Sequence, residues 1–154
     1  MANFFDLIGR IMISAIFLFS GIDKIFKYDG TVGWMESFGM PGFLLVPAII
    51  IEILFPLMVI VGYKTKIAAG GLLLFSLLTA FIFHFDFSNQ MQVIAFLKNI
   101  GLAGGMLFLV VNGAKDFSME KKKKIRSFIK NLLLFKITII NLPKNNKQNS
   151  YHNT

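Results

Sequence analysis

Four long apolar segments constrain this chain more than any other feature of its sequence. They cover residues 7–26, 43–63, 67–84 and 91–112. Each is close to the roughly 20 residues that an α-helix needs to cross the hydrocarbon core of a bilayer. Because backbone amides find no water there, the segments are expected to be helical. The sequence therefore predicts an all-α integral membrane protein built as a four-helix bundle.

The first segment is the weakest of the four, since its uninterrupted apolar core runs only over residues 11–22. A run of that length is also typical of the apolar region of a signal peptide. However, Asp6 offsets the charge of Arg10 ahead of it, and residues 21–24 offer no small-x-small cleavage site. We therefore expect the first helix to be retained.

The composition supports a membrane protein and narrows its chemistry. Charged residues make up 16% of the chain, against about a quarter in a typical soluble domain. There are no cysteines, which excludes disulfides, thiol catalysis and cysteine-ligated metals within the chain. The chain has 2 histidines, one of them in the tail, too few for the usual transition-metal site. We predict no bound metal and no cofactor held by the chain alone.

The net charge of +8 is carried by the C-terminal part of the chain. Basic and acidic residues balance over 1–114, whereas 115–154 are strongly basic. Behind a membrane domain such a tail marks the cytoplasmic side better than it marks nucleic-acid binding. The turn at 62–66 is also basic, and the loop at 85–90 has no Lys or Arg. We predict a membrane domain over 1–114, a cytoplasmic tail over 115–154, and both termini in the cytoplasm.

Two segments outside the spans have patterns of their own. Residues 27–42 are interpreted as a loop whose aromatic side chains lie at the headgroup layer. Residues 125–142 carry apolar side chains at helical spacing, which predicts an amphipathic helix on the membrane surface. A fifth span is the alternative, weakened by Lys130 and Lys136. Four lysines ahead of this segment either bind anionic lipid or serve only as a topology signal; they are Lys121, Lys122, Lys123 and Lys124.

Ionisable residues inside the apolar segments are the best clue to function. Each costs about 2.5–3.5 kcal/mol in a span on insertion scales, so each should be paired, hydrated or functional. With a rise of about 1.5 Å per residue, Glu52 lies about 13 Å and Lys98 about 10 Å below the outer surface. We expect a polar pocket that opens outward in the outer half of the membrane. Its candidate residues are Asp23, Lys24, Glu52, His84, Lys98 and Asn99.

Two interpretations of this group remain open. The pocket could hold a quinone head group, a small polar substrate or a proton path. Alternatively, Glu52 and Lys98 pair only to neutralise each other, while Asp23, Lys24 and His84 lie at the wet interface. For Glu52 and Lys98 the first is favoured, because burying an ion pair is a poor way to gain stability. For Asp23, Lys24 and His84 the interfacial position is favoured.

Helical spacing also predicts which faces point inward. In the first span, Arg10, Ser14 and Gly21 recur every three or four residues with Lys24, and so share one face. Arg10 and Ser14 lie toward the cytoplasmic end. In the fourth span Lys98 shares a face with Gly101 and Gly105, whose small size allows close helix packing. We therefore expect these faces to point into the bundle, with Gly21, Gly101 and Gly105 as packing positions.

Three stretches together resemble the DoxX family. Residues 9–24 are similar to its opening helix, which carries spaced Arg, Phe, Gly and Lys. Glu52 followed by the turn at 62–65 is similar to its second helix and turn. His84 closing the third segment, followed by residues 96–105, resembles its Lys-Asn and Gly-Gly signature.

This resemblance implies a four-helix protein of the bacterial inner membrane. Its recurring polar positions correspond to Arg10, Lys24, Glu52, His84, Lys98 and Asn99. The family includes relatives linked to quinol oxidation, which implies a quinone-linked redox or respiratory accessory subunit with a redox protein partner. Alternatives are a non-catalytic membrane scaffold for partner enzymes, or a small-solute or proton-coupled transporter, which would form a homo-oligomer. Lysines in the 62–66 turn and the basic tail depart from the family pattern.

Overall fold

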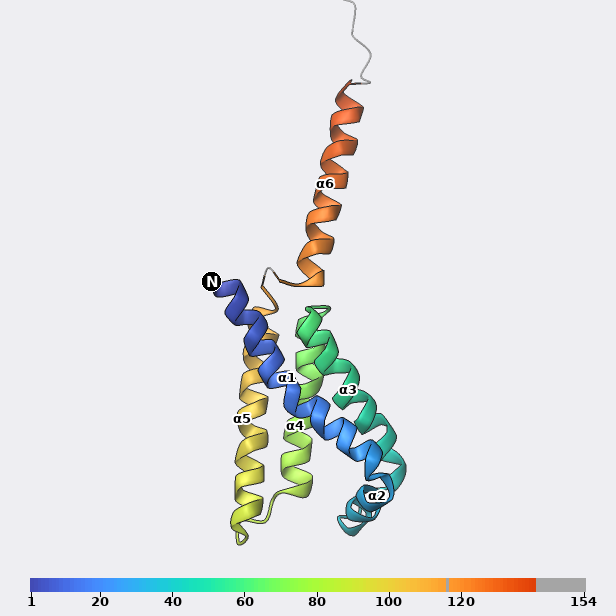
Figure 1. The fold of residues 1–154 in the computed structure, drawn as a ribbon, viewed down its shortest axis with the longest axis vertical. Helices are drawn as coiled ribbons and strands as arrows, with labels where there is room; N and C mark the ends of the chain where they lie inside the picture. The colour runs from blue at the N-terminus through green and yellow to red at the C-terminus, as the bar shows by residue number, and fades with distance from the viewer. Residues whose placement is uncertain (116, 141–154) are drawn as a thin grey trace, which may run out of the picture. The chain divides into compact units, whose positions relative to one another are not determined.

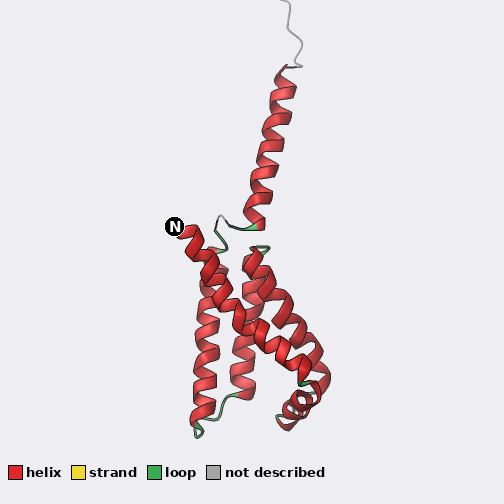
Figure 2. Ribbon diagram, in the orientation of Figure 1, coloured by secondary structure: helices red, strands yellow, loops and turns green. Residues whose placement is uncertain are grey.

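The computed structural model describes residues 1–115 and 117–140, with side chains through residue 134. That part of the chain is helical and contains no strand (Figure 2). The helices are α1 Ala2–Phe26, α2 Tyr28–Ser37, the short 3-10 helix η1 Gly42–Leu44, α3 Leu45–Val61, α4 Thr65–Phe83, α5 Gln90–Asn112 and α6 Met119–Ile140.

Four helical segments are long and apolar enough to cross a membrane. They are Ala2–Phe26, Gly42–Val61, Thr65–Phe83 and Gln90–Asn112. Each coincides with a predicted span to within a few residues, so the all-α, four-span membrane fold is confirmed. α6 is not among the helices that meet these criteria in the described residues. Its composition thus counts against a fifth span.

The prediction of a loop over 27–42 was wrong, because that segment contains the helix α2. α1 ends at Lys27, and the Thr31 hydroxyl donates to the Lys27 carbonyl within the first turn of α2. The helix ends where Gly39 adopts a φ of 73° and the Met40 N–H bonds to the Met35 carbonyl. The sequence therefore predicted the turn at Gly39 correctly, but it did not predict the helix α2 that precedes this turn.

The compact unit of the fold runs from Met1 to Lys121. Within it α1 packs against α3, α3 against α4, and α4 against α5, whereas α1 meets α5 over a much smaller area (Figure 1). One end of the bundle carries α2 and the α4–α5 loop, and we call it the α2 end. The buried apolar core is formed by Phe17, Val59, Ala68, Ala69, Leu72, Met106 and Leu109.

The inward face of α1 matches the prediction from helical spacing, and that of α5 matches it only in part. α1 buries Arg10, Ser14, Phe17 and Gly21. A Cβ added at Gly21 would lie 3.0 Å from the Glu52 Cβ, so glycine lets α1 approach α3 closely.

On α5 the expectation that Gly101 packs inside the bundle was wrong. A Cβ at Gly101 would meet nothing within 4 Å. The buried residues of α5 are Asn99, Ala103, Met106 and Leu109. Ala103, Met106 and Leu109 pack inside the bundle, and Gly101 lies at its edge. Gly105 is a packing position as expected, because an added Cβ there would overlap the Ile13 side chain of α1.

Gly62 ends α3 with a φ of 70°, a conformation that side chains with a Cβ rarely adopt. Its carbonyl accepts a hydrogen bond from the Glu120 N–H at 3.1 Å. A Cβ there would lie 2.8 Å from the Ser118 Cα. The turn therefore needs glycine both for its backbone angle and because residues 118–120 lie directly against it.

Local hydrogen bonds close the α4–α5 loop at the α2 end. The Ser88 hydroxyl and N–H both donate to Asp86 Oδ1, at 2.6 and 3.0 Å. These two hydrogen bonds, the hydroxyl first, lower the pKa of the Asp86 carboxyl. The Asn89 side chain then caps α5 by accepting from the Met91 N–H. Asp86 therefore remains ionised as part of the turn.

α6 is described by itself, since the chain divides into two units after Lys121. It begins at Met119, six residues earlier than the predicted 125–142 helix. Its first turns carry the four lysines, and Ile125, Phe128, Ile129 and Leu132 are exposed on it. The expectations for residues 141–154 lie outside the described part of the chain.

Candidate functional site

A cavity of about 200 Å³ lies at the α2 end of the bundle and receives side chains from α1, α2, α3, α4 and α5. It combines aromatic walls with several polar groups. Five of the six residues that the sequence singled out for a pocket line it. The polar residues of the lining are Ser20, Lys24, Thr31, Glu52, Thr79, His84, Lys98 and Asn99.

Glu52 on α3 is the buried anion of the cavity, with 3% of its surface exposed. Its Oε1 accepts from the Ser20 hydroxyl and from Lys24 Nζ, each at 3.0 Å, and Lys24 Nζ lies 2.8 Å from Oε2. Lys24 also donates to the Ser20 hydroxyl at 2.6 Å. The partner of Glu52 is thus Lys24 of α1, and the alternative pairing with Lys98 was wrong. One carboxylate oxygen, Oε2, has this ion pair but no hydrogen bond within the described residues.

Two local features determine the surroundings of Glu52. Gly21, one turn before Lys24, lets the two helices approach so that the ammonium reaches the carboxylate. Pro56 lies four residues after Glu52 inside α3. Because proline has no N–H, the Glu52 carbonyl lacks its usual helical hydrogen bond at this level. The backbone beside the carboxylate is therefore more polar than an ordinary turn of a membrane helix.

Lys98 and Asn99 bring α5 to the cavity in different ways. Lys98 is exposed at its edge, and within the described residues its ammonium has neither a hydrogen bond nor an ion pair. Asn99 is buried, and its amide donates to the Ala95 carbonyl at 3.0 Å. Its side-chain oxygen is left available to the cavity. α5 thus offers a cation and an acceptor that are not used inside the fold.

His84 and Asp23 differ in their relation to the cavity. His84 lines it, and its Nδ1 lies 2.7 Å from Gln92 Oε1 across the α4–α5 loop. Gln92 was not predicted, since nothing in the sequence signals this contact. Asp23 does not line the cavity and pairs with Lys27 at 2.8 Å on the surface. Neighbouring residues on a helix point about 100° apart, so Asp23 turns away where Lys24 turns in.

The aromatic side chains of the lining come from α1, α2 and α4. The Trp34 ring is stacked on Phe83 of α4, with 4.7 Å between centroids and 28° between planes. Phe38 packs against both rings, at 5.1 and 5.5 Å. The neighbouring Met35 is buried against the same cavity. The sequence indicated an interfacial Trp34 but gave no sign that a helix would carry it over a pocket.

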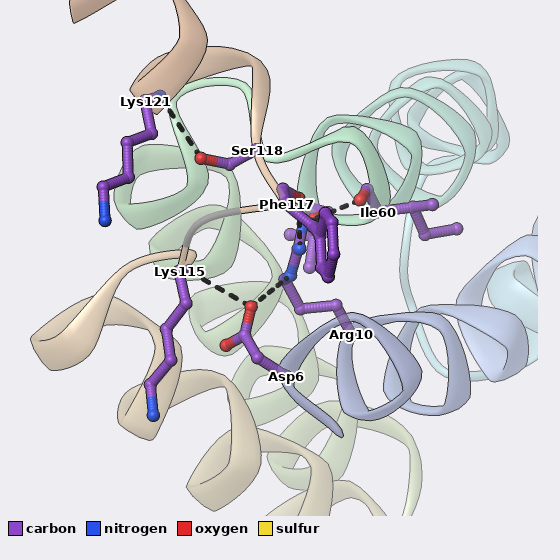
Figure 3. A network of polar contacts seen from close by, with 8 residues as sticks. Asp6, Arg10, Ile60, Lys115, Phe117, Ser118 and Lys121 are labelled. Carbon is purple, nitrogen blue, oxygen red and sulfur yellow. Dashed lines mark hydrogen bonds and ion pairs between the residues drawn. The ribbon is translucent and has the colours of Figure 1, made fainter. Parts of the chain in front are cut away.

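Arg10 forms a second polar cluster, at the opposite end of α1 (Figure 3). Its side chain is 1% exposed and donates to Asp6 Oδ2 at 3.0 Å. It also donates to the carbonyls of Val59, Ile60 and Phe117, at 3.0, 2.7 and 2.6 Å. The first two belong to the last turn of α3, where helical hydrogen bonding is incomplete; the Val59 carbonyl also accepts from the Gly62 N–H at 3.2 Å. Arg10 therefore fastens the segment after α5 to α1 and α3.

One further hydrogen bond completes this cluster, which is structural in character. Asp6 Oδ2 also accepts from the Lys115 N–H at 3.1 Å. Ser14, one turn along α1, is fully buried, and its hydroxyl has no partner in the part of the chain described. With about 1.5 Å of rise per residue, Arg10 lies roughly 20 Å along α1 from Lys24. The cluster is thus separate from the cavity.

Comparisons with known proteins agree with this architecture. The DoxX family model matches residues 5–85. The inner membrane protein YqjF of Escherichia coli is 36% identical over 115 residues, covering 75% of this chain and 88% of that protein. Inner membrane protein YphA of the same organism is 31% identical over 123 residues, with 75% and 88% covered.

A eukaryotic protein is also similar, over part of its length. The Surfeit locus protein 4 homolog of Schizosaccharomyces pombe is 29% identical over 130 residues, covering 80% of this chain but 39% of that protein. No solved structure matches the chain significantly. The matched family region contains Lys24, Glu52 and His84, which are three of the cavity's ionisable residues.

Proposed function

Because the chain belongs to the DoxX family of membrane proteins, we propose that it is a quinone-binding accessory subunit of the bacterial inner membrane. The head group of the quinone would occupy the cavity at the α2 end. The observation that carries the proposal is a cavity at the level of the spans that holds a buried carboxylate and an unpartnered lysine among the described residues. Electrons would come from a protein partner, since the chain has no cysteine.

The size and walls of the cavity suit one flat ring. An engineered cavity of about 150 Å³ is known to bind benzene, and this cavity is about 200 Å³. Trp34 and Phe83 offer ring faces, which favour offset stacking on another aromatic or quinoid ring. A single ring with small substituents therefore fits, whereas a nucleotide or a haem is too large.

The polar groups suit the oxygens of such a ring. The Lys98 ammonium can donate to a carbonyl oxygen at the edge of the ring. The His84 ring, whose Nδ1–H donates to Gln92 Oε1, can accept at Nε2 from a hydroxyl on the reduced form. The Glu52 carboxylate lines the cavity and is also an acceptor offered to a hydroxyl on the reduced form. Lys24 holds the carboxylate in place and balances its charge. These residues would thus bind both forms and provide a position for the proton.

The proposal includes an orientation. The turn with Lys64 and Lys66 and the start of the basic tail lie at the end opposite the cavity. The positive-inside rule assigns that end, and both termini, to the cytoplasm. The cavity would then lie in the outer half of the membrane, about 15 Å along α3 and about 12 Å along α5 from their outer ends.

The single tryptophan of the chain provides the test, because Trp34 is part of the cavity wall. We expect the tailless head group of ubiquinone to quench Trp34 fluorescence saturably in nanodiscs that contain the purified protein. Ala48→Phe places a ring in the cavity and should weaken this binding by about tenfold or more. The measurement is a fluorescence titration of both proteins.

The matched control is Ala15→Phe, the same substitution at an exposed position of α1. It should bind as the wild type does. Quinones that merely dissolve in the lipid would quench Trp34 without saturation, and equally in all three proteins. That result would remove the basis for a quinone site here.

A further inference from the structure

We propose that the cavity is entered sideways from the bilayer, through an opening between α1 and α5 beside Gly101. The ligand class is then a lipid-dissolved amphiphile, whose ring lies in the cavity while its hydrocarbon tail passes through the opening into the lipid. The identity of the ring rests on the proposed function. We call the opening, bordered by Ile16, Lys98 and Gly101, the lateral portal.

α1 and α5 are in contact at the level of Gly105 but not at the level of Gly101. At Gly105 an added Cβ would overlap the Ile13 side chain of α1, so the two helices touch there. At Gly101, one turn nearer the α2 end, an added Cβ would meet nothing within 4 Å. Lys98, almost one turn further, lines the cavity. Since Lys98, Gly101 and Gly105 lie on one side of α5, the empty position lies between the closed contact and the cavity.

Two exposed residues of the cavity lining lie on this same side, where α1 faces α5. Ile16 of α1 lines the cavity and is 37% exposed, and Lys98 of α5 also lines it and is exposed. Phe17 and Leu45 line other walls and are buried, at 4% and 0% exposed. Apart from Trp34 of α2, which is 40% exposed, the exposed residues of the lining therefore lie where α1 faces α5, at the level of the hydrocarbon.

The end of the cavity that faces water is covered by α2. Met35 is 6% exposed beneath this helix, and Trp34 stacks on Phe83 beside it. Phe38 packs edge-on against Phe83 and extends the cover. The sequence predicted a pocket open to the outside, but this covering helix was not anticipated. A ligand from the aqueous side would have to displace the aromatic cluster, whereas one from the lipid would not.

The surface next to the portal suits a hydrocarbon tail with a polar ring ahead of it. Ile94 and Leu97 are 54% and 60% exposed on α5, on the same side as Gly101. Lys98, next to Leu97 in the chain, lines the cavity and is exposed. A cation in a span is costly unless it is paired or hydrated, so a ring oxygen that contacts it would be held at the entrance of the cavity.

The test compares two ligands and two matched glycine variants. Gly101→Phe fills the portal, and Gly104→Phe adds the same ring to the same helix at a position that is also open. The probes are decylubiquinone, which has a tail, and the tailless ubiquinone head group. Both are titrated against Trp34 fluorescence in nanodiscs.

We expect Gly101→Phe to weaken decylubiquinone by about tenfold or more and to leave the tailless head group within about twofold of wild type. Gly104→Phe should bind both ligands as wild type does. If Gly101→Phe is poorly folded by thermal unfolding, Gly101→Leu replaces it, with the same pattern expected.

Equal binding of decylubiquinone by wild type and a folded Gly101 variant would overturn the portal and leave the quinone site intact. Equal loss of both ligands in the Gly101 variant would also overturn it, because the substitution would then have damaged the cavity itself. Absence of saturable binding of either ligand to the wild type would instead overturn the proposed function, and the inference with it.

Discussion

Replacing Lys24 by methionine is expected to destabilise the protein by about 3–5 kcal/mol, the usual cost of leaving one partner of a buried ion pair alone. Glu52 is 3% exposed, and Lys24 is the cation beside it. Methionine keeps much of the length of the side chain but none of its charge. The free energy of unfolding would be measured in bicelles, at neutral pH.

A double variant separates the effect of the lost charge on stability from the effect of altered packing. Glu52→Gln in the Lys24→Met background removes the unpaired carboxylate and should restore most of the lost stability. Lys27→Met is the control, since its pair with Asp23 is exposed and is expected to contribute less than about 1 kcal/mol. If Lys24→Met lost as little stability as Lys27→Met, Glu52 would have another partner in the membrane.

Replacing Arg10 by methionine is expected to cost a similar amount, about 3–5 kcal/mol. The substitution leaves Asp6 without its cation and frees the carbonyls of Val59, Ile60 and Phe117. Arg10→Lys keeps the charge but not the planar fork of donors, so it should restore only part of the loss.

The local readout is hydrogen exchange of the segment that Arg10 fastens. The N–H groups of Lys115 and Glu120 bond to Asp6 and to the Gly62 carbonyl. Both should exchange faster in Arg10→Met than in wild type. The control is Lys66→Met, which removes a single exposed bond to the Val111 carbonyl. Unchanged exchange in Arg10→Met would show that residues 115–120 are held by other contacts.

The sequence predicted the features that depend on length and periodicity. The four spans follow from runs of apolar residues, because a membrane helix must be about that long. The buried face of α1 follows from the spacing of Arg10, Ser14, Phe17 and Gly21. The same spacing brought Lys24 to the cavity, although its partner was not identified.

The features that were missed depend on how helices rotate and pair. Lys24 and Lys98 were both near Glu52 in depth, and depth alone does not choose between them. Ala103, Met106 and Leu109 pack inside the bundle and thereby determine the rotation of α5 about its axis. In this rotation Gly101 lies at the edge of the bundle. α2 was missed because an interfacial helix of ten residues has too short an apolar pattern to distinguish from a loop. Because α2 and the rotation of α5 were missed, the sequence predicted a cavity that opens outward, whereas the lateral portal that we propose opens toward the lipid.

The most direct test of the central claim, that the cavity at the α2 end binds a quinone ring, is photoaffinity labelling with an azido-quinone in native membranes, read by peptide mapping. We predict adducts on Trp34, Lys98 and their neighbours in the lining, suppressed by an excess of decylubiquinone. Adducts confined to lipid-facing residues such as Phe19 and Phe108, and unaffected by the competitor, would contradict the account.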